Sequence, residues 1–353
     1  MFCIAAFIVL VFMAAVSARY RRYLGRAWNC TLRRVTFRPC DTTFKQDIKD
    51  HLLAPLAVRR PKLVGPASVA LEVVALLVVL TTVWSAYVVV KSGVNLYVYG
   101  TCNKQDSASC SLGAEACSIP DQTPTFGESL LSGDVIGAFG NDFASLGETF
   151  SAIPSRMQNW EAEEYLPANA SYLGVYDAKK ETALEVIDPG CTYCLQLFNN
   201  IEEAGFDDRM NLTYIAYPIA ADDGYKFQNS LLVTQYLEAL RLNPLADVAT
   251  PVDWEILRRI YTEVDDKGVS WQSVINGAEP AVATALLQDW SAEFGLSPEQ
   301  VADVASVAAS DEVADIIAAN TRLVEESIHT VKIPTIIFDG RRHDGLVSVG
   351  DLD

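Results

Sequence analysis

Two cysteines carry the clearest chemical signal in the sequence. They stand three residues apart in the segment Asp188-Pro189-Gly190-Cys191-Thr192-Tyr193-Cys194. An apolar run over 182–187 predicts a strand that ends just before this segment, and apolar spacing over 191–204 predicts a helix that begins in it. A helix N-terminus carries unpaired N–H groups and about half a positive charge, so a cysteine there can have a pKa of about 3.5–7.5. We therefore expect Cys191 to be a nucleophile.

The spacing of the two cysteines fits reversible disulfide chemistry. Cys194 follows Cys191 by one helical turn, close enough to form a small, reducible disulfide and to resolve a mixed disulfide on Cys191. Zinc is a poorer explanation, because it needs four ligands and the nearby candidates His329 and His343 are fourteen residues apart. A purely structural disulfide would remove little chain entropy from so short a loop. We expect neither a metal ion nor a cofactor.

Two features elsewhere support a redox site. Glu185 lies within the apolar strand, on the same face as Ala183 and Ile187. If it is buried, its pKa is raised and it can exchange a proton with the resolving thiol; the alternative is a solvated position at a sheet edge. Ile333-Pro334 directly precedes an apolar strand over 335–338. If that peptide bond is cis, residue 333 offers backbone polar groups to an extended substrate, which an ordinary turn proline would not do.

The rest of this half of the chain combines short strands with a long helical stretch. Further strands are predicted over 172–177, 210–219 and 346–349. About 105 residues before the Ile-Pro pair show helical spacing, and Thr250-Pro251 and Ser297-Pro298 mark two helix starts within them.

This arrangement resembles the thioredoxin superfamily over roughly residues 170–350. The long helical insertion, about 221–327, is similar to that of the DsbA-like branch. The resemblance implies an α/β thioredoxin-like fold in which Glu185 is the branch's acidic residue. It also implies that Thr192 and Tyr193 tune the redox potential, and that Ile333 and Pro334 bind substrate.

The N-terminal part of the chain predicts a membrane anchor. Phe2–Ala18 and Val73–Val90 are uncharged apolar runs, and about 20 residues cross a membrane. Residues 1–66 hold 12 Lys and Arg against 3 Asp and Glu, whereas residues 91–353 hold 15 against 41. Because basic loops stay in the cytoplasm, we expect the acidic part outside. The first run can instead be a signal peptide cleaved after Ala18, but no basic segment precedes it and a basic cluster follows it.

Five parts make up the predicted organisation. They are a transmembrane helix over 1–18, a basic cytoplasmic loop over 19–66, a second transmembrane helix over 67–91, a partly helical extracytoplasmic stalk over 92–168, and the thioredoxin-like domain over 169–353. The formal net charge of −18 argues against a nucleic-acid partner. The 50% of hydrophobic residues excludes a disordered chain.

The remaining cysteines leave two pairings open. Under this topology Cys30 and Cys40 face the cytosol, where we favour reduced structural thiols over a pair that passes electrons outward. Four cysteines outside the C-x-x-C segment face outward: Cys3, Cys102, Cys110 and Cys117. Either they form two structural disulfides that tie the ends of the spans to the stalk, or Cys3 is a lipid-buried thiol and one stalk cysteine is unpaired.

Together the residues and the resemblance predict a membrane-anchored, extracytoplasmic thiol–disulfide oxidoreductase. We expect it to act as an oxidase that gives disulfides to exported proteins, and the resemblance implies reoxidation by a quinone-linked membrane partner. One alternative is a reductase or isomerase that serves cytochrome or copper-site thiols. Another is a non-enzymatic adaptor in a membrane complex, which an unreactive or fully buried Cys191 would favour.

Overall fold

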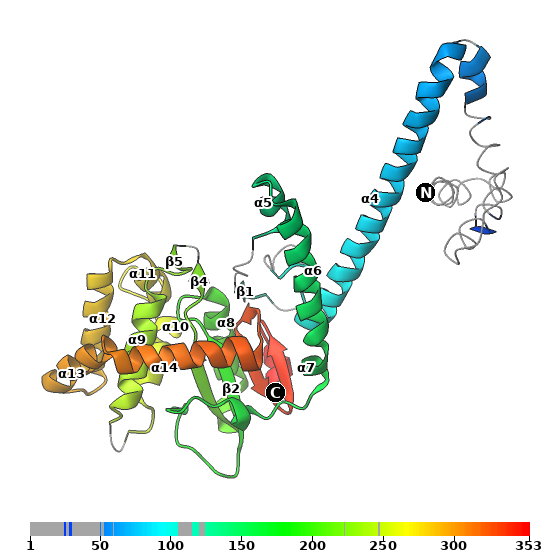
Figure 1. Ribbon diagram of the computed structural model, residues 1–353. Helices are drawn as coiled ribbons and strands as arrows, with labels where there is room; N and C mark the ends of the chain where they lie inside the picture. Colours follow the sequence, from blue (N-terminus) through cyan, green and yellow to red (C-terminus); the bar gives the residue numbers. More distant parts are fainter. Residues whose placement is uncertain are drawn as a thin grey trace. The chain divides into compact units, whose positions relative to one another are not determined.

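The chain forms two units, Met1–Val90 and Lys91–Asp353. The computed structural model (Figure 1) describes residues 25, 28–29, 50, 53–58, 60–104, 115–119, 124–221, 223–245 and 248–353. The predicted first span, Phe2–Ala18, lies outside the described residues, as do Cys3, Cys30, Cys40 and Cys110.

One long apolar helix occurs in the described part of the chain. A short turn, η2 (Pro61–Leu63), leads into α4 (Val64–Tyr99) without a break (Figure 1, blue to cyan). The 39 residues Pro61–Tyr99 are long and apolar enough to cross a membrane, and they include the predicted run Val73–Val90. The prediction of a second span at the N-terminus stays a prediction.

The segment after α4 folds into short helices of the second unit. These are α5 (Phe126–Leu131), α6 (Val135–Ser151), α7 (Ile153–Met157) and the turn η3 (Ala162–Tyr165). The last turns of α4 bind α6: Lys91 forms an ion pair of 2.6 Å with Asp142, and the Thr149 hydroxyl donates to Asn95 Oδ1 at 2.8 Å.

A four-stranded sheet of order β3-β2-β7-β8 forms the centre of the second unit. Its strands are β2 (Glu181–Ile187), β3 (Met210–Ala216), β7 (Thr335–Phe338) and β8 (Arg341–Asp344). β2 and β3 are parallel and are joined through α8 (Thr192–Ala204), since parallel neighbours need a crossover connection. β7 and β8 are antiparallel to their neighbours. The predicted strands over 182–187, 210–219 and 335–338 are confirmed, although β3 ends at Ala216.

Two predicted strands are wrong. Residues 172–177 contain only an isolated bridge from Tyr172 to Thr213, because Gly174 at φ 91° interrupts the extended backbone. The final strand is β8 rather than 346–349. It is set by the two-residue turn Asp339-Gly340, in which both residues have positive φ, the geometry of a tight hairpin. Residues 346–349 instead lead into α15 (Val349–Leu352).

The predicted helical insertion is confirmed (Figure 1, yellow to orange). It contains α9 (Ser230–Leu242), α10 (Val252–Thr262), α11 (Trp271–Gly277), α12 (Pro280–Glu293), α13 (Pro298–Ala308), α14 (Asp311–Arg322) and the π-helical end η5 (Leu323–Ile328). The expected capping box is present at Ser297 and Gln300. The start at Thr250 is wrong by one residue, since Pro251 is the N-cap of α10 and α10 has no side-chain cap.

A buried charge cluster joins the insertion to the sheet. Arg241 of α9 pairs with Glu238 and Asp253, each at 3.2 Å, and its side chain donates to the backbone oxygen of Tyr214 in β3 at 2.9 Å. The Tyr214 hydroxyl also donates to Asp253, at 2.9 Å. Because these charges are out of water, the cluster stabilises the fold only while every member keeps its partners.

Arg241→Leu should therefore cost about 3–5 kcal/mol of the free energy of unfolding, since it leaves two buried carboxylates without their cation. Arg258→Leu is the matched control: the ion pairs of Arg258 with Glu202 and Glu255 are about one-third exposed, so its loss should stay within about 1 kcal/mol. Urea unfolding followed by tryptophan fluorescence measures both losses. Equal losses for the two variants would show that the buried cluster is unimportant.

Candidate active site

Both cysteines of the C-x-x-C segment lie at the start of α8. β2 ends at Ile187 and α8 begins at Thr192, so Cys191 is the N-cap and Cys194 lies in the first turn. The Cys194 N–H donates to the Cys191 backbone oxygen at 3.1 Å. Cys194 is a buried free thiol whose sulfur accepts a hydrogen bond of 3.4 Å from the backbone N–H of Asp188.

The Asp188 carboxylate holds the turn that presents these cysteines. It accepts hydrogen bonds from the backbone N–H of Gly190 at 2.8 Å and of Ile219 at 2.7 Å, and from the Ser230 hydroxyl. Burial raises the pKa of Asp188 to about 6, against the lowering effect of these donors. The motif contains Asp188, but its role is not predictable from the sequence, because two of its partners, Ile219 and Ser230, come from distant segments.

Side chains of the insertion also hold the turn. Gln272 of α11 donates to the backbone oxygens of Pro189 at 2.9 Å and of Cys191 at 3.0 Å. Asn276, one turn later, donates to the Gly190 oxygen at 2.9 Å. These two amides were not predicted, since no local pattern distinguishes them from other polar residues of a helix.

The Ile333-Pro334 segment lies beside the first cysteine. Its peptide bond is cis, and the Cys191 sulfur is 3.7 Å from the Ile333 backbone oxygen. β7 begins at Thr335 and runs next to β2, so this loop reaches the same edge of the sheet as the start of α8. The fold thus brings Cys191 and Cys194 together with Ile333 and Pro334, although the two pairs are distant from each other in the sequence.

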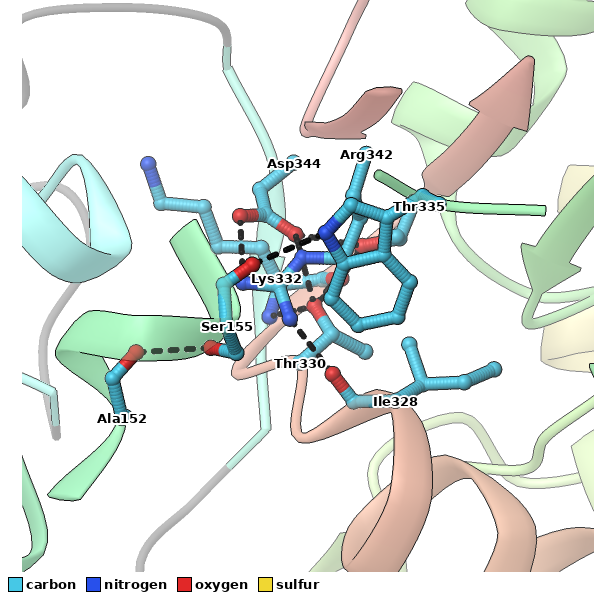
Figure 2. A network of polar contacts seen from close by, with 9 residues as sticks. Ala152, Ser155, Ile328, Thr330, Lys332, Thr335, Arg342 and Asp344 are labelled. Carbon is cyan, nitrogen blue, oxygen red and sulfur yellow. Dashed lines mark hydrogen bonds and ion pairs between the residues drawn. The ribbon is translucent and has the colours of Figure 1, made fainter. Parts of the chain in front are cut away.

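A polar network fixes the backbone on both sides of Pro334. Figure 2 shows Thr330, Thr335, Arg342 and Asp344 around this loop. The Thr330 and Thr335 hydroxyls share a hydrogen bond of 2.7 Å, and Thr335 also contacts the Lys332 backbone oxygen at 2.7 Å. Arg342 donates to Asp344 at 3.1 Å. The backbone around Pro334 is therefore held by Thr330, which precedes it in the chain, and by Thr335, which follows it.

Glu185 is buried under this site, as predicted. Its side chain comes from the middle of β2, a strand paired on one side with β3 and on the other with β7, and the residue is 1% exposed. One carboxyl oxygen, Oε1, has no hydrogen-bond partner among the described residues. Burial raises the pKa of Glu185 to about 8, so the carboxyl is mostly protonated at neutral pH.

The same environment keeps the second cysteine protonated. Burial is the first reason why the pKa of Cys194 lies well above its ordinary value, and the charges of Glu185 and Asp188 raise it further. Between the two cysteines, Thr192 is exposed and Tyr193 is partly buried. Their predicted influence on the redox potential stays a prediction.

The partner of Cys191 differs from the predicted one. Cys191 forms a disulfide with Cys117, 74 residues earlier, rather than with Cys194. The pairing of Cys117 within the stalk group is therefore wrong, while Cys102 is disulfide-bonded and Cys3 and Cys110 lie outside the described residues. The spacing of the cysteines does not predict this link, because it carries no information on which distant segments the fold brings together.

A short strand carries Cys117 to the site. β1 (Cys117–Ser118) pairs antiparallel with β6 (Lys332–Ile333), with Cys117 opposite Ile333. Cys191 is 0% exposed in this arrangement. The site is therefore a disulfide between a helix N-cap and an extended segment that lies against the residue preceding a cis-proline.

Several solved proteins are similar to this chain. No family model matches the sequence, and no curated protein matches it. The thiol-disulfide exchange protein alpha-DsbA2 of Wolbachia pipientis is 15% identical, over 54% of this chain and 87% of that one, with a TM-score of 0.39. MdbA, a thiol-disulfide oxidoreductase of Corynebacterium matruchotii, is 20% identical over 52% and 91%, with a TM-score of 0.37. ScsC of Proteus mirabilis, in a compact conformation, is 13% identical over 63% and 96%, with a TM-score of 0.33.

The similar solved proteins include a thiol-disulfide exchange protein, two thiol-disulfide oxidoreductases and a thioredoxin-like oxidoreductase of Silicibacter pomeroyi.

Proposed function

We propose that this chain is a membrane-anchored, extracytoplasmic thiol–disulfide oxidoreductase that exchanges disulfides with exported proteins, as an oxidase. The disulfide of Cys191 with Cys117 carries the proposal. It joins a sulfur at a helix N-terminus to a cysteine in an extended strand beside Ile333, 3.7 Å from the Ile333 oxygen. An extended substrate that pairs with the same backbone would place its own cysteine in the same position.

The two cysteines of the motif have different surroundings, and this difference gives each a role. In the oxidised enzyme, a substrate thiolate attacks the Cys191 sulfur, the Cys191–Cys194 bond breaks, and Cys194 leaves. A second substrate thiol then attacks the substrate sulfur of the mixed disulfide and releases Cys191. The helix N-terminus stabilises Cys191 as a thiolate at that step. The substrate gains a disulfide and the enzyme holds two thiols.

Glu185 supplies the proton for the departing sulfur. Cys194 is buried, so it leaves as a thiol rather than as a thiolate. The Glu185 carboxyl is protonated below its pKa of about 8 and lies in the same buried region. In the reverse direction the Glu185 carboxylate takes the proton when Cys194 attacks.

The proposed cellular location and partners of the protein follow from α4 as a membrane anchor and from the acidic charge of the second unit. α4 would fix the chain in a bilayer, and the acidic second unit would face outward, away from the basic N-terminal loop. Thiols of exported proteins are then the substrates, and a quinone-linked membrane oxidase would restore the disulfide. Thr192 and Tyr193 would set the potential against which these partners work.

A second candidate, a non-enzymatic adaptor, is favoured by one observation: Cys191 is 0% exposed. The cover over it, however, is the segment that carries Cys117, which is attached through a reducible bond. Reaction of Cys191 with an alkylating reagent after mild reduction supports the oxidoreductase. A Cys191 that stays unreactive once the disulfide is reduced supports the adaptor.

Cys191→Ser should abolish exchange, because no other described cysteine is the N-cap of a helix. Cys194→Ala should trap mixed disulfides with substrates, because Cys194 can no longer attack the Cys191 sulfur and reverse them. Oxidation of a peptide with two thiols measures the first effect, and non-reducing gels of membranes measure the second. Cys102→Ser, which breaks a disulfide outside the C-x-x-C segment, is the control for loss of a cysteine. Full activity of Cys191→Ser would refute the proposed function.

The reduction potential of the site decides the direction of electron flow. An oxidase should have a potential near −120 mV and a reductase one near −270 mV, the values at the two ends of the superfamily. Titration of the full chain in glutathione buffers gives this number when mass spectrometry follows alkylated Cys191, which is a free thiol only in the reduced site. A reduction potential near −270 mV would contradict the oxidase and indicate that the same site acts as a thiol reductase.

Glu185→Gln should slow resolution of a mixed disulfide between Cys191 and glutathione by about 100-fold at pH 8, because Cys194 loses its base. The wild-type rate should rise as pH passes the Glu185 pKa of about 8, and the variant should lack this rise. Stopped-flow fluorescence measures the rate in a Cys117→Ser background, where the site is open, and Glu185→Asp should restore part of it.

Stability gives an independent check on the same carboxyl. Burial raises the folded-state pKa of Glu185 from 4.5 to about 8, so wild-type stability should fall as pH rises between these values. In Glu185→Gln that fall should be absent. A variant that alters stability but keeps the pH profile of resolution would remove Glu185 from the proton transfer.

A further inference from the structure

Residues 115–119, called the strap here, lie across the face of the site at which a substrate would bind. The strap is held at both ends by backbone atoms. The Leu346 N–H donates to the Glu115 oxygen at 2.9 Å, and the Ile119 N–H donates to the Val331 oxygen at 3.0 Å. These contacts fix the strap along the loop that contains the cis-proline.

The middle of the strap makes the contacts expected of a bound peptide. Cys117 lies opposite Ile333, and Ser118 lies opposite Lys332, in an antiparallel pair. Lys226 donates from its ammonium group to the Ser118 backbone oxygen at 3.3 Å. An extended segment recognised through its backbone can be replaced by another extended segment of different sequence.

The site also contains a thiol that can release the strap. Cys194 is free and buried, and its N–H donates to the Cys191 oxygen, one turn of α8 apart. The chain therefore holds three cysteines at one place, with one disulfide among them. Cys191 is the sulfur common to both possible bonds, because it lies between the strap and the helix interior.

We propose that Cys117 is a third exchanging cysteine of the site, and that the strap is a tethered substrate surrogate that caps Cys191. This inference rests on the proposed function, and it adds an internal competitor to it. The once-oxidised chain exists in two forms, one closed by Cys117–Cys191 and one open with Cys191–Cys194. Exported substrates react with the open form.

Interconversion of the two forms needs no external oxidant or reductant. The Cys194 sulfur, as its thiolate, attacks the Cys191 sulfur, a Cys191–Cys194 bond forms, and the Cys117–Cys191 bond breaks. Cys117 leaves as a thiolate and takes a proton, while the proton of Cys194 passes to the Glu185 carboxylate. One disulfide and one thiol are present before and after, so the number of electrons in the chain is unchanged.

Because the strap is part of the same chain, its effective concentration at the site is high, and a soluble substrate at low concentration competes with it poorly. The observed reactivity of the site is then reduced to the fraction of chains in the open form. The cap keeps a reactive disulfide from small thiols, and a substrate has to capture the site while the strap is away. Because the strap belongs to the same chain, this control does not depend on protein concentration.

The first test uses the full-length wild-type chain in detergent, equilibrated in glutathione buffers of different potential. After acid quenching and alkylation, the oxidised chains are those whose Cys191 is unlabelled; among them the closed form carries label on Cys194 and the open form carries it on Cys117. We expect both forms, with a ratio that is constant while the total amount of oxidised chain changes. A ratio that changes with potential, or no peptide that links Cys117 to Cys191, overturns the inference.

The second test compares a variant without a cysteine in the strap with a variant in which that cysteine is moved by one residue. Cys117→Ser should raise the initial rate of oxidation of a dithiol peptide by about tenfold if about 90% of the chain is closed. The matched control combines Cys117→Ser with Ser118→Cys, which moves the thiol by one residue and so to the other face of the strand. It should behave as Cys117→Ser does and form no link to Cys191.

The outcomes separate this inference from the proposed function. If Cys117→Ser leaves the rate unchanged and Cys191→Ser abolishes activity, the role of the strap as a cap is refuted and the oxidoreductase function is supported. A link to Cys191 that forms equally well from residue 118 shows that the strap is not docked in register, and this also overturns the inference. Full activity in Cys191→Ser refutes both the proposed function and the further inference.

Discussion

The approach of the Cys191 sulfur to the Ile333 backbone oxygen, 3.7 Å away, is the contact on which the site depends. It exists because two connections meet at one edge of the sheet. β2 ends in the turn held by Asp188, and β7, which is paired with β2, begins directly after the cis Ile333-Pro334 bond. The sulfur is thereby placed where backbone groups can align an incoming chain, and no side-chain recognition is needed for that alignment.

The two motif cysteines are unequal because they hold different positions in the first turn of α8. Cys191 lies at a helix N-terminus, which favours a thiolate, whereas Cys194 lies one turn deeper, where burial favours the thiol. Glu185 shares that buried region and has a pKa of about 8 for the same reason. In the proposed mechanism, the position of each cysteine in the first turn of α8 thus separates the sulfur that reacts with substrate from the sulfur that exchanges a proton with Glu185.

Local signals in the sequence were sufficient for the elements but not for their partners. The C-x-x-C helix, the apolar β2, the capping box at Ser297 and the proline before β7 could be predicted because each depends on residues within one turn or strand. The hairpin that forms β8 was missed, although Asp339-Gly340 is a turn signal, because its strand is polar. The Cys117–Cys191 bond, the Asp188 contacts and the α11 amides could not be predicted, since they depend on tertiary packing across 30 to 90 residues.

The helical insertion belongs to the site as well as to the surface. Gln272 and Asn276 bind the backbone oxygens of the turn before α8, and Arg241 joins α9 to β3 within a buried charge cluster. A movement of the insertion would therefore change the position of the turn that presents Cys191. A displacement of α9 would leave a buried charge of this cluster without its partner, so the cluster opposes movement of the insertion at this point. The strap is the contrasting element: besides its disulfide and the packing of Cys117 and Ile119 against the core, it is held by hydrogen bonds to its backbone, which another extended chain could make in its place.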